Sequence, residues 1–178
     1  MRRSLLTSAC LATLISVPVL AQARPSFAGV WTQVDSTPAR ILTSESATVV
    51  RVGNMGSGWG SPITITQATD SLVIEVVQFS VYDHMPKLRY AYALNGDESR
   101  NAVMIGHAES VQHSRVSWSG NALVITTVHR VPAGAAGNAE SVEVRQVLSL
   151  GPNGTLVVET TRPGARAPNV VRTIFTKR

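Results

Sequence analysis

The side chains best suited to metal or acid–base chemistry are four histidines: His84, His107, His113 and His129. Zinc ligands in proteins usually come from close spacings along one element, often together with cysteines. No two of these histidines stand two residues apart on a strand or four apart on a helix, and the only cysteine, Cys10, lies near the N-terminus. The sequence therefore predicts no metal site.

A glycine-rich stretch at 53–62 is the part of the chain that could hold a phosphate. It reads GNMGSGWGSP, which lacks the G-x-G-x-x-G spacing and leads into neither a helix nor a Lys-Ser/Thr pair. We therefore expect a hairpin loop. Trp59 stands among the glycines, where it has little local core to join. Two roles stay open for it: it covers a barrel mouth or stacks on a ligand, or it is an ordinary loop residue.

The residue spacing does not support nucleophilic or carboxylate catalysis. No serine stands in a G-x-S-x-G turn, which also requires a strand-turn-helix that this chain lacks. Glu75, Glu143 and Glu159 fall on predicted strands among residues that look outward, which is typical of solvated charges. We predict that the protein is not an enzyme and needs no cofactor.

The elements that must position these residues are β-strands, because apolar and polar residues alternate along most of the chain after the N-terminal stretch. Turn pairs such as Asn95-Gly96 and Asn153-Gly154 separate short runs rich in β-branched and aromatic residues. The predicted strands are 27–34, 47–52, 63–67, 72–79, 88–94, 103–106, 114–118, 123–131, 142–150, 155–161 and 170–176. This pattern predicts an all-β fold, an antiparallel up-and-down barrel of eight to ten strands.

The alternation also predicts which side chains face the interior. Tyr90 and Tyr92 share one face of the strand 88–94, and His129 lies on the same face as Leu123 of its own strand. Each buried hydroxyl or ring nitrogen needs a hydrogen-bond partner. That partner is either a neighbouring side chain or water in a filled core, or a ligand, and both alternatives stay open. With Trp59, these two tyrosines and His129 are the candidate ligand contacts.

The N-terminal residues predict export. Met1-Arg2-Arg3 is followed by an apolar stretch from Leu5 to Leu20 and then by Ala21-Gln22-Ala23, which is the layout of a secretory signal peptide. The stretch is short for a membrane span of about 20 apolar residues and is interrupted by a serine and a proline. We expect a signal peptide at 1–23, cleavage after Ala23, no membrane span afterwards, and a periplasmic or extracellular protein.

Removal of residues 1–23 leaves residues 24–178 as a single domain without cysteine, so its stability depends on burial instead of disulfides. The predicted signal peptide contains two arginines and no acidic residue. The remaining 14 basic and 11 acidic residues give the mature chain a formal charge of +3. The basic residues are scattered and form no stripe with aromatic residues between them, which predicts no nucleic-acid partner. Nothing in the composition indicates an oligomeric state.

Phe27-Ala28-Gly29-Val30-Trp31 follows the leader directly and resembles the opening G-x-W strand of lipocalin-like (calycin) barrels. The stretches 63–67, 72–75, 92–101, 116–125, 146–150, 156–163 and 172–177 are similar to a set of uncharacterised secreted bacterial proteins of that architecture. The cysteines and the C-terminal helix of secreted lipocalins are missing. The resemblance implies a barrel that binds a small apolar or amphipathic molecule. The alternative is a ligand-free structural or protein-interaction barrel of the cell envelope.

The same resemblance implies how the barrel closes. In lipocalin-like barrels the tryptophan of the first strand plugs one end, and an arginine of the last strand packs across its ring. Trp31 and Arg172 take these roles here, with Gly29 beside them. Arg172 shares a face of its predicted strand with Val170 and Ile174. If that face points outward, Arg172 is only solvated, and this alternative stays open.

Overall fold

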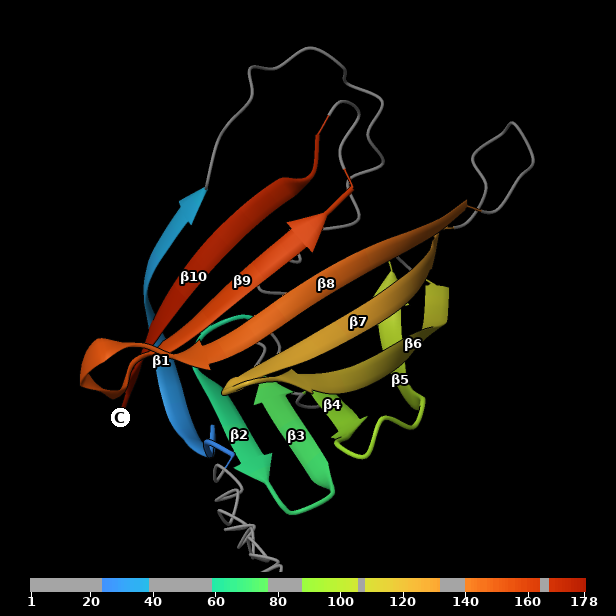
Figure 1. The fold of residues 1–178 in the computed structure, drawn as a ribbon. Helices are drawn as coiled ribbons and strands as arrows, with labels where there is room; N and C mark the ends of the chain where they lie inside the picture. Colours follow the sequence, from blue (N-terminus) through green and yellow to red (C-terminus); the bar gives the residue numbers. More distant parts are fainter. Residues whose placement is uncertain (1–23, 39–58, 77–87, 106–107, 132–139, 164–166) are drawn as a thin grey trace, which may run out of the picture.

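Ten antiparallel strands, all within the described part of the chain, form one sheet that curls into a nearly closed up-and-down barrel (Figure 1). The computed structural model describes residues 24–38, 59–76, 88–105, 108–131, 140–163 and 167–178. The predicted leader, the predicted strand 47–52 and most of the glycine-rich stretch lie outside these residues. The prediction of an all-β barrel is confirmed.

The strands are longer on the C-terminal side of the chain than the sequence predicts. They are β1 (Gly29–Pro38), β2 (Ile63–Gln67), β3 (Ser71–Val76), β4 (Leu88–Ala93), β5 (Ser99–Ile105), β6 (Ala108–Ser119), β7 (Ala122–Val131), β8 (Glu140–Leu150), β9 (Leu156–Arg162) and β10 (Asn169–Lys177), with a 3-10 turn η1 (Pro152–Gly154). The predictions for β5 and β6 started too late because Ser99, Asn101 and Gln112 are polar yet buried. Inward polar residues hide the alternation that marks a strand.

Consecutive strands pair as hairpins everywhere except between β4 and β5, and β1 pairs with β10. The sheet order is therefore β4-β3-β2-β1-β10-β9-β8-β7-β6-β5. The start of β1 lies between two partners, with Trp31 opposite both Ile63 and Lys177. A bulge between Gln33 and Asp35 shifts the register of β1 against β10. We call the end of the barrel where β1 begins and β10 ends the base, and the opposite end the far end.

Side chains join the edges of β4 and β5, where the ladder is missing. Asn101 Oδ1 accepts a hydrogen bond from the Ala91 amide at 2.7 Å, and Asn101 Nδ2 donates one to the Ala91 carbonyl at 3.1 Å. Ser99 Oγ accepts one from the Ala93 amide at 2.8 Å. The amide of Asn101 thus takes the place of a peptide group of a neighbouring strand. We call this junction the β4–β5 seam.

Aromatic side chains and the N-terminal segment close the base. Trp31 is buried, and its Nε1 donates to the Phe27 carbonyl at 2.8 Å. The Phe27 ring stacks on Trp118 with centroids 6.1 Å apart, and the Arg24 guanidinium lies 5.1 Å from the centre of the Trp118 ring. Gln67 of β2 fastens the segment, because its Oε1 accepts from the Phe27 amide at 2.8 Å. The base is therefore a packed plug.

The seam gives the first testable prediction. Asn101→Ala removes two hydrogen bonds and leaves the Ala91 amide unpaired, so we expect a loss of about 1–3 kcal/mol in the free energy of unfolding. Ser117→Ala on the exposed face of β6 is the control and should stay within about 0.5 kcal/mol of the wild type. Urea denaturation measures both. Hydrogen exchange should accelerate at Ala91, and unchanged exchange there would contradict this account of the seam.

Candidate functional site

The interior surface of β6 to β10 changes from apolar near the base to polar toward the far end. Near the base it consists of buried aliphatic and aromatic side chains: Leu123, Leu148, Leu156, Val158 and Phe175. Further along the same strands it carries buried polar side chains: Gln112, Ser114, Thr127, His129, Gln146, Thr160 and Thr173. Alternate residues of each strand face the interior, so the inward-facing residues of the same strands form the apolar region near the base and the polar region farther along. We call the second set the polar wall.

Part of the polar wall satisfies its own hydrogen bonds. Ser114 Oγ and Thr127 Oγ1 lie 2.9 Å apart on paired positions of β6 and β7. Gln112 Nε2 donates to His129 Nδ1 at 3.1 Å. Because Nδ1 accepts this bond, the neutral His129 ring carries its proton on Nε2. Each of these two pairs is joined by a side-chain hydrogen bond inside the barrel.

His129 lies in an environment that favours its neutral form. Burial lowers the pKa of His129, and the positive charge of Arg162 lowers it further. Desolvation also lowers the pKa of Arg162, which is half-buried at the far end of β9. A proton on Nδ1 would break the bond from Gln112 and place a second positive charge near Arg162. The polar wall is therefore built around a neutral histidine.

Two hydroxyl groups of the polar wall have no hydrogen-bond partner in the described structure. They are Thr160 Oγ1 on β9 and Thr173 Oγ1 on β10, and the two residues are 0% and 2% exposed. Thr160 lies opposite Val171 and Thr173 opposite Val158, so the two threonines are diagonal neighbours on one face. A buried hydroxyl without a partner costs about 1–3 kcal/mol. These two hydroxyls are the unsatisfied side-chain oxygens of the polar wall.

The aromatic candidates lie on β4 and in the segment before β2. Tyr90 and Tyr92 are buried on β4, as the alternation predicts, and burial raises the pKa of both hydroxyls. A hydrogen bond joins the Trp59 and Tyr92 side chains. The structure thus brings Trp59 and Tyr92 together, and His129 belongs to the polar wall on β7. Their contact with a ligand stays a prediction.

The prediction that Trp59 has little core to join is wrong. Trp59 is 5% exposed and belongs to the same core as Trp31 and Ile63. Its ring stands shortly before β2, where the chain enters the sheet, and the Tyr92 hydroxyl satisfies its polar edge. Burial of a large ring outweighs the local glycine-rich composition.

The predicted contact between Trp31 and Arg172 is also wrong. The register places Arg172 opposite Thr37, and the Arg172 side chain is exposed. The cation beside Trp31 is Lys177, whose Nζ lies 5.6 Å from the ring centre. Gly29 makes room for it: its φ is +148°, and a Cβ there would lie 2.5 Å from Lys177 Cε. Trp31 and Gly29 keep their closing roles with another partner.

Sequence reasoning missed most of the polar wall. Thr160 and Thr173 share a face with Leu156 and Phe175, so strand alternation could have placed them inside. Arg162 falls just beyond the predicted strand 155–161. Polar residues are usually taken as outward-facing, and this assumption hid them.

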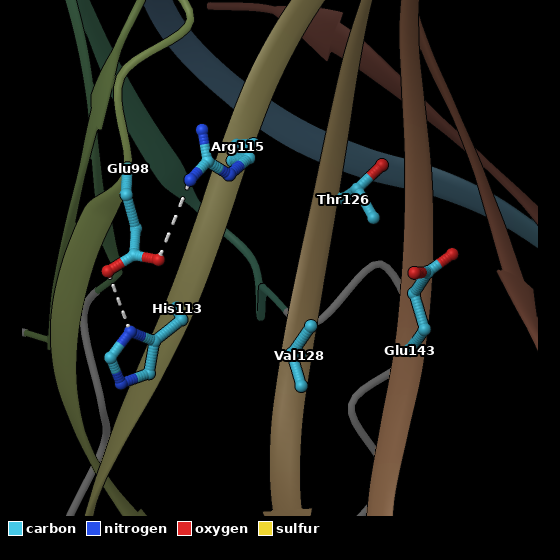
Figure 2. Close-up of a pocket in the computed structure, with 6 residues that line it drawn as sticks. All are labelled: Glu98, His113, Arg115, Thr126, Val128 and Glu143. Carbon is cyan, nitrogen blue, oxygen red and sulfur yellow. Dashed lines mark hydrogen bonds and ion pairs between the residues drawn. The ribbon is translucent and has the colours of Figure 1, made fainter.

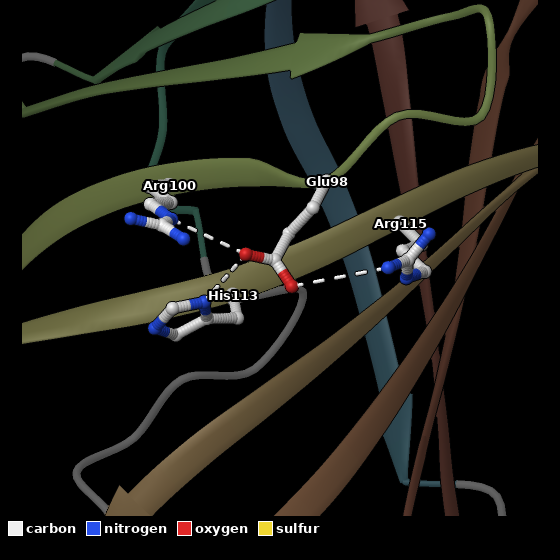
Figure 3. A network of polar contacts seen from close by, with 4 residues as sticks. All are labelled: Glu98, Arg100, His113 and Arg115. Atoms are coloured by element: carbon white, nitrogen blue, oxygen red, sulfur yellow. Dashed lines mark hydrogen bonds and ion pairs between the residues drawn. The ribbon is translucent and has the colours of Figure 1, made fainter.

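A hollow of about 350 Å³ lies on the outer face of the barrel and is lined by Glu98, His113, Arg115, Thr126, Val128 and Glu143 (Figure 2). The Glu98 carboxylate is its organising group. It accepts from His113 Nδ1 at 2.9 Å and from Arg100 Nε at 3.2 Å, and Arg115 Nη2 lies 4.0 Å away (Figure 3). The bonds from His113 and Arg100 lower the pKa of Glu98. Because His113 and Arg115 alternate with buried residues of β6, this hollow is separate from the interior.

Within the described ranges, no three His, Cys, Asp or Glu side chains lie close enough to hold a metal ion. His84 and His107 lie outside those ranges. No helix in the described part of the chain is long and apolar enough to cross a membrane.

Comparison with known proteins identifies the fold. No family model matches the sequence, and no curated protein matches it. A solved structure that is similar is the ileal bile acid-binding protein of zebrafish in complex with cholic acid. It has a TM-score of 0.54 and 18% sequence identity, over 85% of this chain and 98% of that chain. The likeness shows a shared barrel fold. In the barrel of this chain, ten strands of the described residues surround the interior and the N-terminal segment plugs the base.

The core position of Trp59 can be tested by truncation. Trp59→Ala should lower the free energy of unfolding by about 3–5 kcal/mol, because a buried large aromatic is lost together with its bond to Tyr92. Val34→Ala on the exposed face of β1 is the control and should change it by less than about 0.5 kcal/mol. Chemical denaturation measures both. A loss of less than about 1 kcal/mol for Trp59→Ala would contradict the core position of Trp59.

His129 predicts a pH dependence of stability. Its folded pKa lies below the unfolded value of about 6.5, so its contribution to stability is present above that pH and is lost as the pH falls below it. The free energy of unfolding should therefore fall between about pH 7.5 and about pH 5.5 in the wild type, and less in His129→Gln. Tyr90→Phe, which removes no group that titrates in this range, should keep the wild-type dependence. Equal slopes for the wild type and His129→Gln would contradict the prediction.

Proposed function

We propose that the barrel binds a small apolar or amphipathic molecule in its interior. The observation that carries this proposal is the division of the interior surface into an apolar region above a closed base and a buried polar wall toward the far end. Ligand sites in proteins are mostly apolar with a few placed polar groups. The zebrafish protein of similar fold was solved in complex with cholic acid, which supports binding of a small amphipathic molecule. Binding, and not catalysis, is the proposed activity.

A ligand-free structural or interaction barrel is the second candidate. It is favoured by the two pairs Ser114–Thr127 and Gln112–His129, which satisfy each other without an occupant. A barrel of this size can be filled by its own side chains. The unpartnered hydroxyls of Thr160 and Thr173 favour the binding barrel, because in a core without a ligand they lower the stability of the fold.

In this proposal the protein is exported to the periplasm or beyond, like the uncharacterised secreted bacterial proteins that its sequence resembles. Support comes from the signal-peptide layout of residues 1–23. The plug supplies further support. Arg24 and Phe27 both contact Trp118, so a mature chain that begins at Arg24 keeps the plug whole.

The binding proposal predicts a bound small molecule. Protein purified from its own host should show, in native mass spectrometry, an added mass that disappears when the protein is denatured. Extraction of the same sample and analysis of the extract then identify the molecule. A bare protein mass under gentle conditions, together with no affinity for any apolar probe, would favour the structural barrel.

The export proposal predicts the mature N-terminus. N-terminal sequencing of protein from the periplasm or the medium should begin at Arg24, because the small residues Ala21 and Ala23 suit a signal peptidase. An intact Met1 in the membrane fraction would overturn the proposal. A start beyond Phe27 would remove the plug and contradict its role.

A further inference from the structure

We propose that the hollow on the outer face of the barrel binds a small zwitterion of dipeptide length, with the ligand carboxylate at Arg115 on β6 and the ligand ammonium group at Glu143 on β8. The hollow is separate from the interior, so this inference goes beyond the proposed interior binding and does not depend on it.

The hollow forms because long side chains surround short ones. Its floor consists of Thr126 and Val128 of β7, which face outward because they alternate with buried residues of that strand. Val128 is half-buried, whereas Val111, on the outer face of β6, is 45% exposed. The longer side chains of β6 and β8 on either side of the floor account for this difference (Figure 2).

The strand register sets the positions of the two walls. His113, Val128 and Glu143 lie opposite one another in one row across β6, β7 and β8. Arg115 lies opposite Thr126 in the next row. The walls therefore stand on strands that are two strand spacings apart, about 9–10 Å.

The β6 wall has an excess of positive charge. The Glu98 carboxylate faces two guanidinium groups, those of Arg100 and Arg115 (Figure 3). Arg115 Nη2 lies 4.0 Å from Glu98 Oε2, and the Arg115 side chain is 69% exposed. A guanidinium carries five N–H donors, so Arg115 can bind a ligand carboxylate and keep its contact with Glu98.

The β8 wall carries the opposite charge. Glu143 is exposed and lines the hollow, and no lysine or arginine among the described side chains forms an ion pair with it. Arg145, two residues further along β8, is the nearest cation of its own strand. The Glu143 carboxylate can therefore accept hydrogen bonds from a ligand ammonium group.

A ligand with charge of one sign meets a like charge in this hollow. An anion at Arg115 lies near Glu98, and a cation at Glu143 lies near Arg145. Like charges at short distance oppose binding. A zwitterion gains attraction at both walls, which offsets these repulsions.

A dipeptide has a suitable length and composition. Two residues of extended chain span about 7 Å, and hydrogen bonds at the two ends complete the distance between the walls. Thr126 offers a hydroxyl that both donates and accepts to the peptide group, and Val128 offers an apolar contact. In a free amino acid the two charged groups share one carbon, so they are too close together to reach both walls.

The test compares one dipeptide with its capped forms. Glycylleucine, N-acetylglycylleucine and glycylleucinamide are titrated into isotope-labelled protein at low ionic strength, because salt screens exposed charges. The backbone amide NMR signals of Thr126 and Val128 report binding. We expect glycylleucine to bind with a Kd of about 1 mM or less, and each capped form to bind about fivefold more weakly because it lacks one exposed ion pair.

Variants assign the two ends of the ligand. Glu143→Gln should remove the preference for glycylleucine over its N-acetyl form, and Arg115→Gln should remove the preference over the amide. The controls are Glu159→Gln and Arg172→Gln, an exposed pair on β9 and β10 outside the hollow, and both should keep the wild-type preferences. Val128→Phe, which fills the hollow, should abolish binding.

Three results would overturn the proposal. Equal affinity for glycylleucine and one capped form would mean that the hollow selects a single charge. Unchanged Thr126 and Val128 signals at about 10 mM glycylleucine would mean that the hollow binds no dipeptide. Loss of the preferences in the two control variants would mean that the overall charge of the barrel, and not the hollow, produces them.

Discussion

The pairing of β1 with β10 is the interaction on which the rest of the barrel depends. The other ladders join strands that follow one another, whereas this ladder joins the two ends of the chain. Trp31 and Lys177 face each other across it, and the absence of a side chain at Gly29 lets the lysine stem lie against the indole. Without this ladder, β1 to β4 and β5 to β10 would be two separate antiparallel sheets. The barrel encloses an interior because β1 and β10 pair with each other.

The β1–β10 ladder joins the two halves of the sheet, but no ladder joins its outer edges, β4 and β5. The sheet order ends at β4 and β5, and three side-chain bonds from Ser99 and Asn101 hold these edges together. Side-chain bonds occupy edge amides that could otherwise pair with another chain. They also lack the cooperativity of a ladder, so the seam is the place where local opening requires the fewest broken bonds. Tyr90 and Tyr92 stand directly beside it.

Strand alternation was enough to predict the class of fold and the inward tyrosines, because both follow from a period of two. It failed where an interior position is polar, as at Asn101 and Gln112, since local sequence carries no record of a hydrogen bond formed across strands. Register is equally non-local. The contact of Trp31 with Lys177 depends on how β10 is aligned with β1, and the bulge at Gln33 helps to set that alignment. Trp59 is buried by residues far along the chain, which its glycine neighbours do not indicate.

The polar wall is hard to explain as packing alone. Valine has nearly the shape of threonine, suits a strand equally well, and needs no hydrogen bond. A structural barrel would therefore gain stability from valine at Thr160 and Thr173. Globular proteins are stable by only about 5–15 kcal/mol, so two unpaired hydroxyls at about 1–3 kcal/mol each are a substantial loss. The same strands show how the loss is avoided elsewhere, because Ser114 and Thr127 bond each other. Packing alone therefore does not account for threonine at these two positions.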